Sequence, residues 1–238
     1  MKILAIDTTA KTATAALVEN EKLIALTVLN TPNTHSVTLL PMIDGLLKGA
    51  GLTVDDIDLF ATSAGPGSFT GVRIGAAAIK GLAFASKKPC VGVSSLEALA
   101  LNVAETEGII CPVMDARRNQ LYNAFFRYEG GKLTRLTEDR VLSAEELKNE
   151  LTGSGEAVYL TGDGSDIAKK ALAENFVKTP HEVLCYHNAY NVALLAYETY
   201  LAASEEERAD FTAEKLAPVY LRMSQAERER LEKLEIKN

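Results

Sequence analysis

The feature of this sequence that most constrains its fold is an order of elements that occurs twice. Residues 2–8 form an apolar run that ends in an aspartate and a threonine, with a second threonine directly after it, which is typical of a buried strand. Two further apolar or β-branched runs, 12–18 and 23–29, are separated by four polar residues and predict a hairpin. The first copy then continues as a helix over 34–50, a strand over 59–64, a helix over 68–86, a strand over 90–93 and a helix from Ser95.

The second copy begins at residues 109–115, again an apolar run that ends in aspartate. It continues as strands over 120–128 and 132–141, a helix opened by the capping box of Ser143 and Glu146, a strand over 158–161 and a helix over 165–175. This repeat predicts an α/β protein with two duplicated lobes, each a mixed sheet with helices, facing each other across a cleft. We place the N-terminal lobe at 1–105 and the C-terminal lobe, with the terminal helices, at 106–238.

Composition narrows the class of protein further. No run approaches the roughly 20 apolar residues that cross a bilayer, and the start turns acidic too early for a secretory signal, so we expect a cytoplasmic protein without membrane association. The three cysteines form no CxxC pair, which argues against a disulfide framework or a structural zinc site. The net charge is −7 and basic residues occur at most in pairs, so we expect nucleic acid to be gripped mainly by another chain.

A glycine-rich segment over 65–75 lies at a predicted strand-to-helix junction. It lacks the Gly-Lys-Ser/Thr ending of a P-loop, the glycine spacing of the dinucleotide fingerprint and the spacing of a nucleophile elbow. Two interpretations stay open. Its backbone amides and helix dipole could hold an anion, or the segment is a tight, specifically shaped turn, which we favour.

The helix over 68–86 carries small residues along one face. Glycine inside a helix costs about 1 kcal/mol relative to alanine, so this stripe predicts a compensating close approach by another helix, either of this chain or of a second subunit. In the preceding helix, Pro41 predicts a late start or a kink. The stripe consists of Gly71, Gly75, Ala78, Leu82 and Ala85.

Three aspartates are candidates for binding a cofactor. Asp7 and Asp115 each end the first strand of a lobe, and Asp163 lies in a Gly-Asp-Gly-Ser turn, where carboxylates could hold a hydrated cation near a nucleotide phosphate. The favoured alternative is that Asp7 and Asp115 accept hydrogen bonds from the amides of the turn that follows each of them, and that residues 162–165 are a turn leading into the helix at Ser165. We predict no catalytic residue.

The histidines do not predict a metal site. His35, His181 and His187 have no partner at metal-binding spacing, so a surface or capping role is expected for each. After a helix over 189–203 and an acidic linker over 204–210, a second capping box at Ser224 opens a charged terminal helix. We favour a solvated helix there over a partner-binding tail.

The repeat, the Ile-Asp-Thr-Thr start, the segment Gly-Pro-Gly-Ser-Phe-Thr-Gly-Val-Arg-Ile-Gly over 65–75 and Pro-Val-Tyr-Leu-Arg over 218–222 together resemble the TsaB (YeaZ) family. The resemblance covers nearly the whole chain, and the segment 65–75 is its most specific part. It implies RNase H-like lobes of the actin/Hsp70/sugar-kinase (actin-like ATPase) superfamily. It also implies a part in forming N6-threonylcarbamoyladenosine at position 37 of tRNAs that read codons starting with A.

One departure bears on catalysis. The paralogous TsaD family carries a His-x-x-x-His metal pair, and Ser95 and Leu99 stand at the matching positions here, where a hydroxyl and an isobutyl group cannot replace imidazoles. The resemblance therefore implies a non-catalytic activator that heterodimerises with TsaD and binds no cofactor alone. ATP and a divalent metal would belong to partner subunits, and a TsaE-like ATPase and tRNA would be reached through the complex.

Two other functions stay open. One is an ATP-dependent small-molecule kinase or acyltransferase of the same superfamily, resting on Asp7, Asp115 and the turn 162–165. The other is an RNA-binding module, which the acidic charge disfavours.

The partner surface is expected on the helices 34–50 and 68–86, packed against the same helices of the paralogue, or of a second copy in a homodimer when the partner is absent. The alternatives are the second lobe and the terminal helix. The expected interface residues are His35, Leu39, Met42, Ile43, Leu46, Gly71, Arg73, Ile74, Gly75, Ala78, Leu82 and Ala85.

Overall fold

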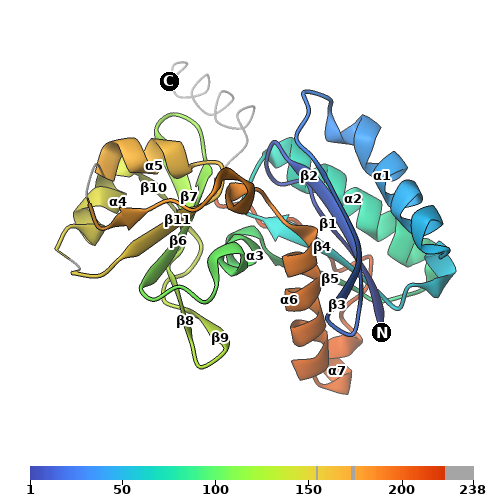
Figure 1. Cartoon of the computed structure of the whole chain (residues 1–238). Helices are drawn as coiled ribbons and strands as arrows, with labels where there is room; N and C mark the ends of the chain where they lie inside the picture. Colours follow the sequence, from blue (N-terminus) through green and yellow to red (C-terminus); the bar gives the residue numbers. More distant parts are fainter. Residues whose placement is uncertain (154, 173–174, 223–238) are drawn as a thin grey trace, which may run out of the picture.

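A computed structural model describes residues 1–153, 155–172 and 175–222, and within them the chain forms two sheets in two lobes (Figure 1). The first sheet has the strand order β3-β2-β1-β4-β5, with β1 antiparallel to β2 and parallel to β4. Its strands are β1 (Lys2–Asp7), β2 (Ala13–Glu19), β3 (Lys22–Leu29), β4 (Leu59–Gly65) and β5 (Cys90–Ser94).

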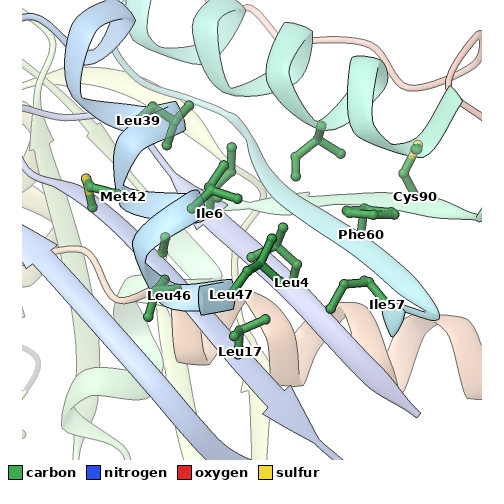
Figure 2. Close-up of a cluster of buried hydrophobic side chains, with 14 of the residues drawn as sticks. Leu4, Ile6, Leu17, Leu39, Met42, Leu46, Leu47, Ile57, Phe60 and Cys90 are labelled. Atoms are coloured by element: carbon green, nitrogen blue, oxygen red, sulfur yellow. The ribbon is translucent and has the colours of Figure 1, made fainter. Parts of the chain in front are cut away.

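Helices cover both faces of this sheet. The helices α1 (His35–Ala50) and α2 (Phe69–Ser86) lie on one face and α6 (Ala189–Ala202) on the other (Figure 1). Successive side chains of β1 alternate between the two clusters: Leu4 packs with α1, as Figure 2 shows, and Ile3 packs with α6. The central strand is therefore apolar throughout because both of its faces are buried.

The helix α1 runs unbroken from His35 to Ala50 with Pro41 inside it, so the late start that Pro41 suggested is wrong. Thr34 precedes its first turn, and Gly51 ends it in the left-handed region at φ 67°. The helix α2 begins after Ser68, whose hydroxyl accepts a hydrogen bond from the amide of Gly71 at 3.3 Å. Both helices therefore lie close to their predicted ranges.

The second sheet repeats the first. Its main order β10-β7-β6-β11-β12 again places the first strand of the lobe, β6, in the centre between β7 and β11, as β1 lies between β2 and β4, which confirms the predicted duplicated α/β lobes. The elements are β6 (Ile109–Asp115), β7 (Gln120–Asn123), β8 (Phe126–Glu129), β9 (Lys132–Arg135), β10 (Arg140–Ser143), α4 (Ala144–Leu151), β11 (Val158–Thr161), α5 (Ser165–Leu172) and β12 (Val177–Lys178).

The predicted strands 120–128 and 132–141 are each divided in two. Pro112 in β6 has no N–H to donate to a neighbouring strand, so pairing with β6 stops between β7 and β8. The side chain of Asn123 fills this gap and donates to the carbonyls of Pro112 and Ala124, each at 3.1 Å. As a result, β8 and β9 form a separate hairpin, and β10 alone extends the sheet beside β7.

The remaining elements lie between the lobes or around the first one. The helix α3 (Ser95–Ala100) and the turn η2 (Leu101–Val103) pack between the lobes (Figure 1). The helix α6 follows residue 105 in the sequence, yet it packs on the first sheet. The boundary between the lobes at residue 105 therefore stays a prediction. Three further elements are the short 3₁₀ turns η1 (Val54–Asp56) and η3 (Glu182–Cys185) and the helix α7 (Glu205–Arg208).

The helix α7 occupies the segment predicted as an acidic linker, and it opens with a capping box of Ser204 and Glu207. The predicted helix from Ser224 lies outside the described residues. Within the described ranges, no helix combines the length and the apolar character needed to span a bilayer.

Candidate functional site

The predicted cleft is present between the lobes, with a volume of about 990 Å³. Its first wall is formed by the loop after β1 and the start of α2. Its second wall is formed by the loop between β6 and β7, and residues 219–222 line it as well. Residues 31–35 and Asp163 also line the cleft, so it brings together segments that lie far apart in the sequence.

Asp7 lies fully buried beneath this region and is bound on both carboxylate oxygens. Its Oδ1 accepts the amide of Thr9 at 2.8 Å and the hydroxyl of Thr9 at 2.7 Å. Its Oδ2 accepts the hydroxyl of Ser63 at 2.5 Å and lies 2.9 Å from Nδ1 of His187. The favoured interpretation, that Asp7 accepts the amides of its own turn, is confirmed, but the contact with His187 could not be predicted.

His187 is buried, with 2% of its surface exposed, so the expected surface or capping role is wrong for this residue. Burial opposes the charged imidazolium, but the carboxylate of Asp7 and its hydrogen bond outweigh this and raise the pKa of His187. For the same reasons the pKa of Asp7 is lowered despite its burial. The two residues therefore form a buried ion pair that joins the end of β1 to the start of α6.

Asp115 binds its own turn, and Asp163 binds the turn of Asp115. Asp115 accepts the amide of Arg117 at 2.7 Å and pairs with its guanidinium at 3.1 Å. Asp163 accepts the amide of Asp115 at 3.1 Å. Asp163 is exposed on one side, but the protein around it raises the pKa of its carboxyl by desolvation. Among the described residues no group of three or more His, Cys, Asp or Glu side chains is arranged to hold a metal.

The glycine-rich segment packs directly on the loop after β1. The amide of Ser68 donates to the carbonyl of Thr9 at 2.6 Å, and the hydroxyl of Thr8 donates to the carbonyl of Gly71 at 2.8 Å. A Cβ at Gly71 would lie 2.0 Å from the carbonyl oxygen of Thr8, and one at Gly75 would lie 2.5 Å from its hydroxyl. The segment is therefore the tight turn that we favoured, and these two glycines admit the loop after β1 rather than another helix.

The motif over 218–222 binds the same segment. The amide of Val219 donates to the carbonyl of Ala64 at 2.7 Å. The ring of Tyr220 lies 4.7 Å from that of Phe69, and its hydroxyl accepts from Nε of Arg73 at 2.8 Å. The guanidinium of Arg73 also lies 3.8 Å above the Phe69 ring. The two motifs behind the family resemblance are therefore one packed unit, a contact that the sequence did not indicate.

The other two histidines have structural roles. His181 accepts the amide of Val183 at 3.4 Å and caps η3, as expected. Nε2 of His35 lies 2.7 Å from the carbonyl oxygen of Ala10, which ties the start of α1 to the loop after β1.

The two positions that match the metal pair of TsaD face the interior. Ser95 is fully buried and donates its hydroxyl to the carbonyl of Pro66. Leu99 is buried in the cluster between the lobes.

The expected interface residues divide by burial. Six of them belong to the core or to the turn that supports it, because the apolar period of a helix marks the face that packs on its own sheet. Four of them are α1 side chains that pack in the cluster, and Figure 2 labels Leu39, Met42 and Leu46 among them. Half-buried side chains of α2 pack against the same cluster, and two residues are exposed. The buried residues are Leu39, Met42, Ile43, Leu46, Gly71 and Gly75, the half-buried ones His35, Ile74, Ala78 and Leu82, and the exposed ones Arg73 and Ala85.

The opposite sides of the same helices form an exposed apolar surface, which we call the outer helix face. Val37 is 67% exposed, Leu40 57% and Phe84 69%. A Cβ added at Gly45, Gly49 or Gly81 would meet no atom within 4 Å, so no contact within the described chain requires glycine there. The outer helix face consists of Val37, Leu40, Pro41, Gly45, Gly49, Ala77, Gly81, Phe84 and Ala85.

Comparisons with known proteins agree on one relationship. The family described as TsaD, tRNA N6-adenosine threonylcarbamoyltransferase, matches residues 30–230. The tRNA threonylcarbamoyladenosine biosynthesis protein TsaB of Bacillus subtilis is 32% identical over 95% of this chain and 96% of its own. TsaB of Haemophilus influenzae is 30% identical over 93% and 94%. The crystal structure of YeaZ from Pseudomonas aeruginosa superposes with a TM-score of 0.77 at 26% identity, over 92% of this chain and 99% of that one.

Proposed function

The chain belongs to the TsaB family of tRNA threonylcarbamoyladenosine biosynthesis proteins, and we propose that it serves this pathway as a non-catalytic subunit that binds a TsaD-like paralogue and makes it competent. The modified nucleoside would be adenosine 37 of tRNAs reading codons that start with A. The work would take place in the cytoplasm, with a TsaE-like ATPase and the tRNA reached through the complex.

The observation that carries this proposal is the outer helix face. Three large apolar side chains, Val37, Leu40 and Phe84, are more than half exposed on two helices that cover one side of the first sheet. Exposed apolar area of this kind is typical of a surface that a partner covers. Gly45, Gly49 and Gly81 each weaken their helix by about 1 kcal/mol relative to alanine without relieving any contact in the chain. Close approach by a second pair of helices would account for them.

Two features support a subunit without its own chemistry. The positions of the metal pair hold Ser95 and Leu99, which pack into the interior and offer no imidazole. In addition, the carboxylate of Asp7 is fully used by Thr9, Ser63 and His187. No oxygen of Asp7 is left to bind a hydrated cation.

Purification of the tagged chain from its native cells, followed by identification of the bound proteins, tests the proposal. We expect a TsaD-like chain among them. A variant with Phe84→Glu should lose that chain because a carboxylate would have to be buried in the contact. Recovery of the partner at the same yield by this variant would place the contact elsewhere.

The alternative of an ATP-dependent kinase or acyltransferase rests on the cleft and on Asp115 and Asp163, which lie together at its second wall. Calorimetry of the isolated chain with ATP and Mg²⁺ separates the two functions. Micromolar binding together with turnover would favour the enzyme. The same isolated chain should form a homodimer through the outer helix face, which light scattering would detect.

A further inference from the structure

The cleft carries a charge opposite to that of the rest of the protein. Five lysines and arginines line it against two aspartates, which leaves three positive charges, whereas the whole chain has a net charge of −7. A concave surface of one sign raises the local concentration of ligands of the opposite sign. The five cations are Lys11, Arg73, Arg117, Arg118 and Arg222.

These cations come from four separate segments: the loop after β1, α2, the loop between β6 and β7, and the segment after α7. In the sequence they appear as single residues and one pair. Along the sequence, basic residues occur at most in pairs, as stated above. In the folded chain, however, five of them line one cleft.

Most of these cations keep their charge available. Arg73 and Arg222 are held by neutral groups, the Tyr220 hydroxyl and the Ala116 carbonyl. Within residues 1–153, 155–172 and 175–222, Arg117 is the one cation of these five with a carboxylate partner, Asp115 at 3.1 Å. For Lys11 and Arg118, both exposed, the described part of the chain supplies neither a hydrogen bond nor an ion pair. The cleft therefore keeps a net positive charge, because Arg117 alone among these five cations is paired with a carboxylate in the described part of the chain.

The geometry favours an extended polyanion over a small phosphate. A compact phosphate site would use the free amides at the start of α2; of these, the amide of Ser68 already donates to the Thr9 carbonyl and that of Gly71 to the Ser68 hydroxyl. The unpaired cations stand instead on opposite walls of an open cleft. Between them, Tyr220 is 42% exposed and rests on Phe69, which offers a ring for a base to stack on.

We propose that this cleft binds the phosphodiester backbone of tRNA, with Lys11 and Arg118 as direct phosphate contacts. The proposal rests on the family's role in tRNA modification for the identity of the polyanion, but it is independent of the surface that binds a partner. It assigns to this chain an RNA contact of its own.

Fluorescence anisotropy with a labelled, unmodified tRNA transcript, on the full chain alone and mixed with a TsaD-like partner, tests the proposal. We count the three net positive charges of the cleft as three phosphate contacts. At about 0.7 each, they give a slope near −2 for the logarithm of the binding constant against the logarithm of the salt concentration, so a fourfold rise in salt should weaken binding about 20-fold. The double variant Lys11→Gln/Arg118→Gln should lower the slope by about 1.4 and weaken binding. The matched control, Lys22→Gln/Lys132→Gln, removes the same charge outside the cleft and should leave the slope unchanged.

Three results would overturn the proposal. The first is no binding of tRNA at 50 mM salt by the chain alone or with its partner. The second is an equal loss in the cleft variant and in the control. The third is a cleft variant that loses Mg-ATP but keeps tRNA. Capture of the TsaD-like partner, measured on the same variants, should not change because Lys11 and Arg118 lie off the outer helix face, so failure of RNA binding and failure of the proposed function are distinguishable.

Discussion

Replacing Asp7 with asparagine tests the buried pair of Asp7 and His187, which joins the end of β1 to the start of α6. The substitution keeps the size of the side chain but removes the charge that faces His187 at 2.9 Å. It also replaces one carboxylate oxygen, an acceptor, with an NH₂ group, which is a donor. That NH₂ group would face a group that now donates to Asp7: the Thr9 hydroxyl, the Ser63 hydroxyl or the His187 imidazole.

The expected loss of stability follows from complete burial. Removing one partner of a buried ion pair costs about 3–5 kcal/mol because the other charge is left without compensation. Without the Asp7 carboxylate, which raises the pKa of His187, the buried imidazole can become neutral, so we expect the lower end, about 3 kcal/mol. In a chain of this size that corresponds to a fall in Tm of about 6–12 °C.

Urea and thermal unfolding followed by circular dichroism at pH 7 would measure this loss. The control is Asp44→Asn, the same change in an exposed i,i+4 pair with Lys48, which should cost less than about 0.5 kcal/mol. A double-mutant cycle with His187→Gln should give a coupling of at least about 1 kcal/mol. A cost for Asp7→Asn within about 1 kcal/mol of zero would refute a buried charged pair.

The remaining predictions concern pH and two kinds of glycine. Folding raises the pKa of His187, so its contribution to the free energy of unfolding is complete below the unfolded pKa of about 6.5 and declines as pH rises through the folded pKa. Folding lowers the pKa of Asp7, so its contribution is complete above about pH 4 and is lost on acidification. The wild type should therefore lose more stability between pH 6 and pH 9 than His187→Gln, and parallel curves for the two proteins would argue against this. Gly71→Ala should destabilise the chain by more than about 2 kcal/mol, since its Cβ would lie 2.0 Å from the carbonyl oxygen of Thr8. Gly81→Ala, with open space around the added Cβ, should instead stabilise the isolated chain by up to about 1 kcal/mol and weaken partner binding. A stabilised variant that binds the partner as well as the wild type does would mean that no partner helix packs closely at Gly81.

Local structure could be predicted from the sequence, because a capping box or a hairpin depends on residues only a few positions apart. The reciprocal hydrogen bonds of Ser143 and Glu146 are present as predicted. The break in the second sheet could not be predicted in the same way, since it depends on Asn123 pairing with Val113, next to Pro112, in a register known only from the fold.

The site was harder to predict because its parts meet only after folding. Asp7 and His187 are separated by 180 residues, and no spacing rule connects them. The small-residue stripe of α2 was visible, but the sequence does not show which side of a helix turns inward. Gly71 and Gly75 serve the turn after β1, whereas Gly81 on the exposed side has no such role.

The central claim is that the outer helix face binds a TsaD-like paralogue. Its most direct test is calorimetric titration of the purified chain with the paralogue from the same organism, with light scattering to establish that one complex contains both chains. We predict binding by the wild type, loss of binding in Leu40→Glu and Phe84→Glu with unchanged circular dichroism, and unchanged binding in the control Lys22→Glu. Unchanged affinity in both outer-face variants would contradict the account and place the contact on the second lobe or on residues 224–238.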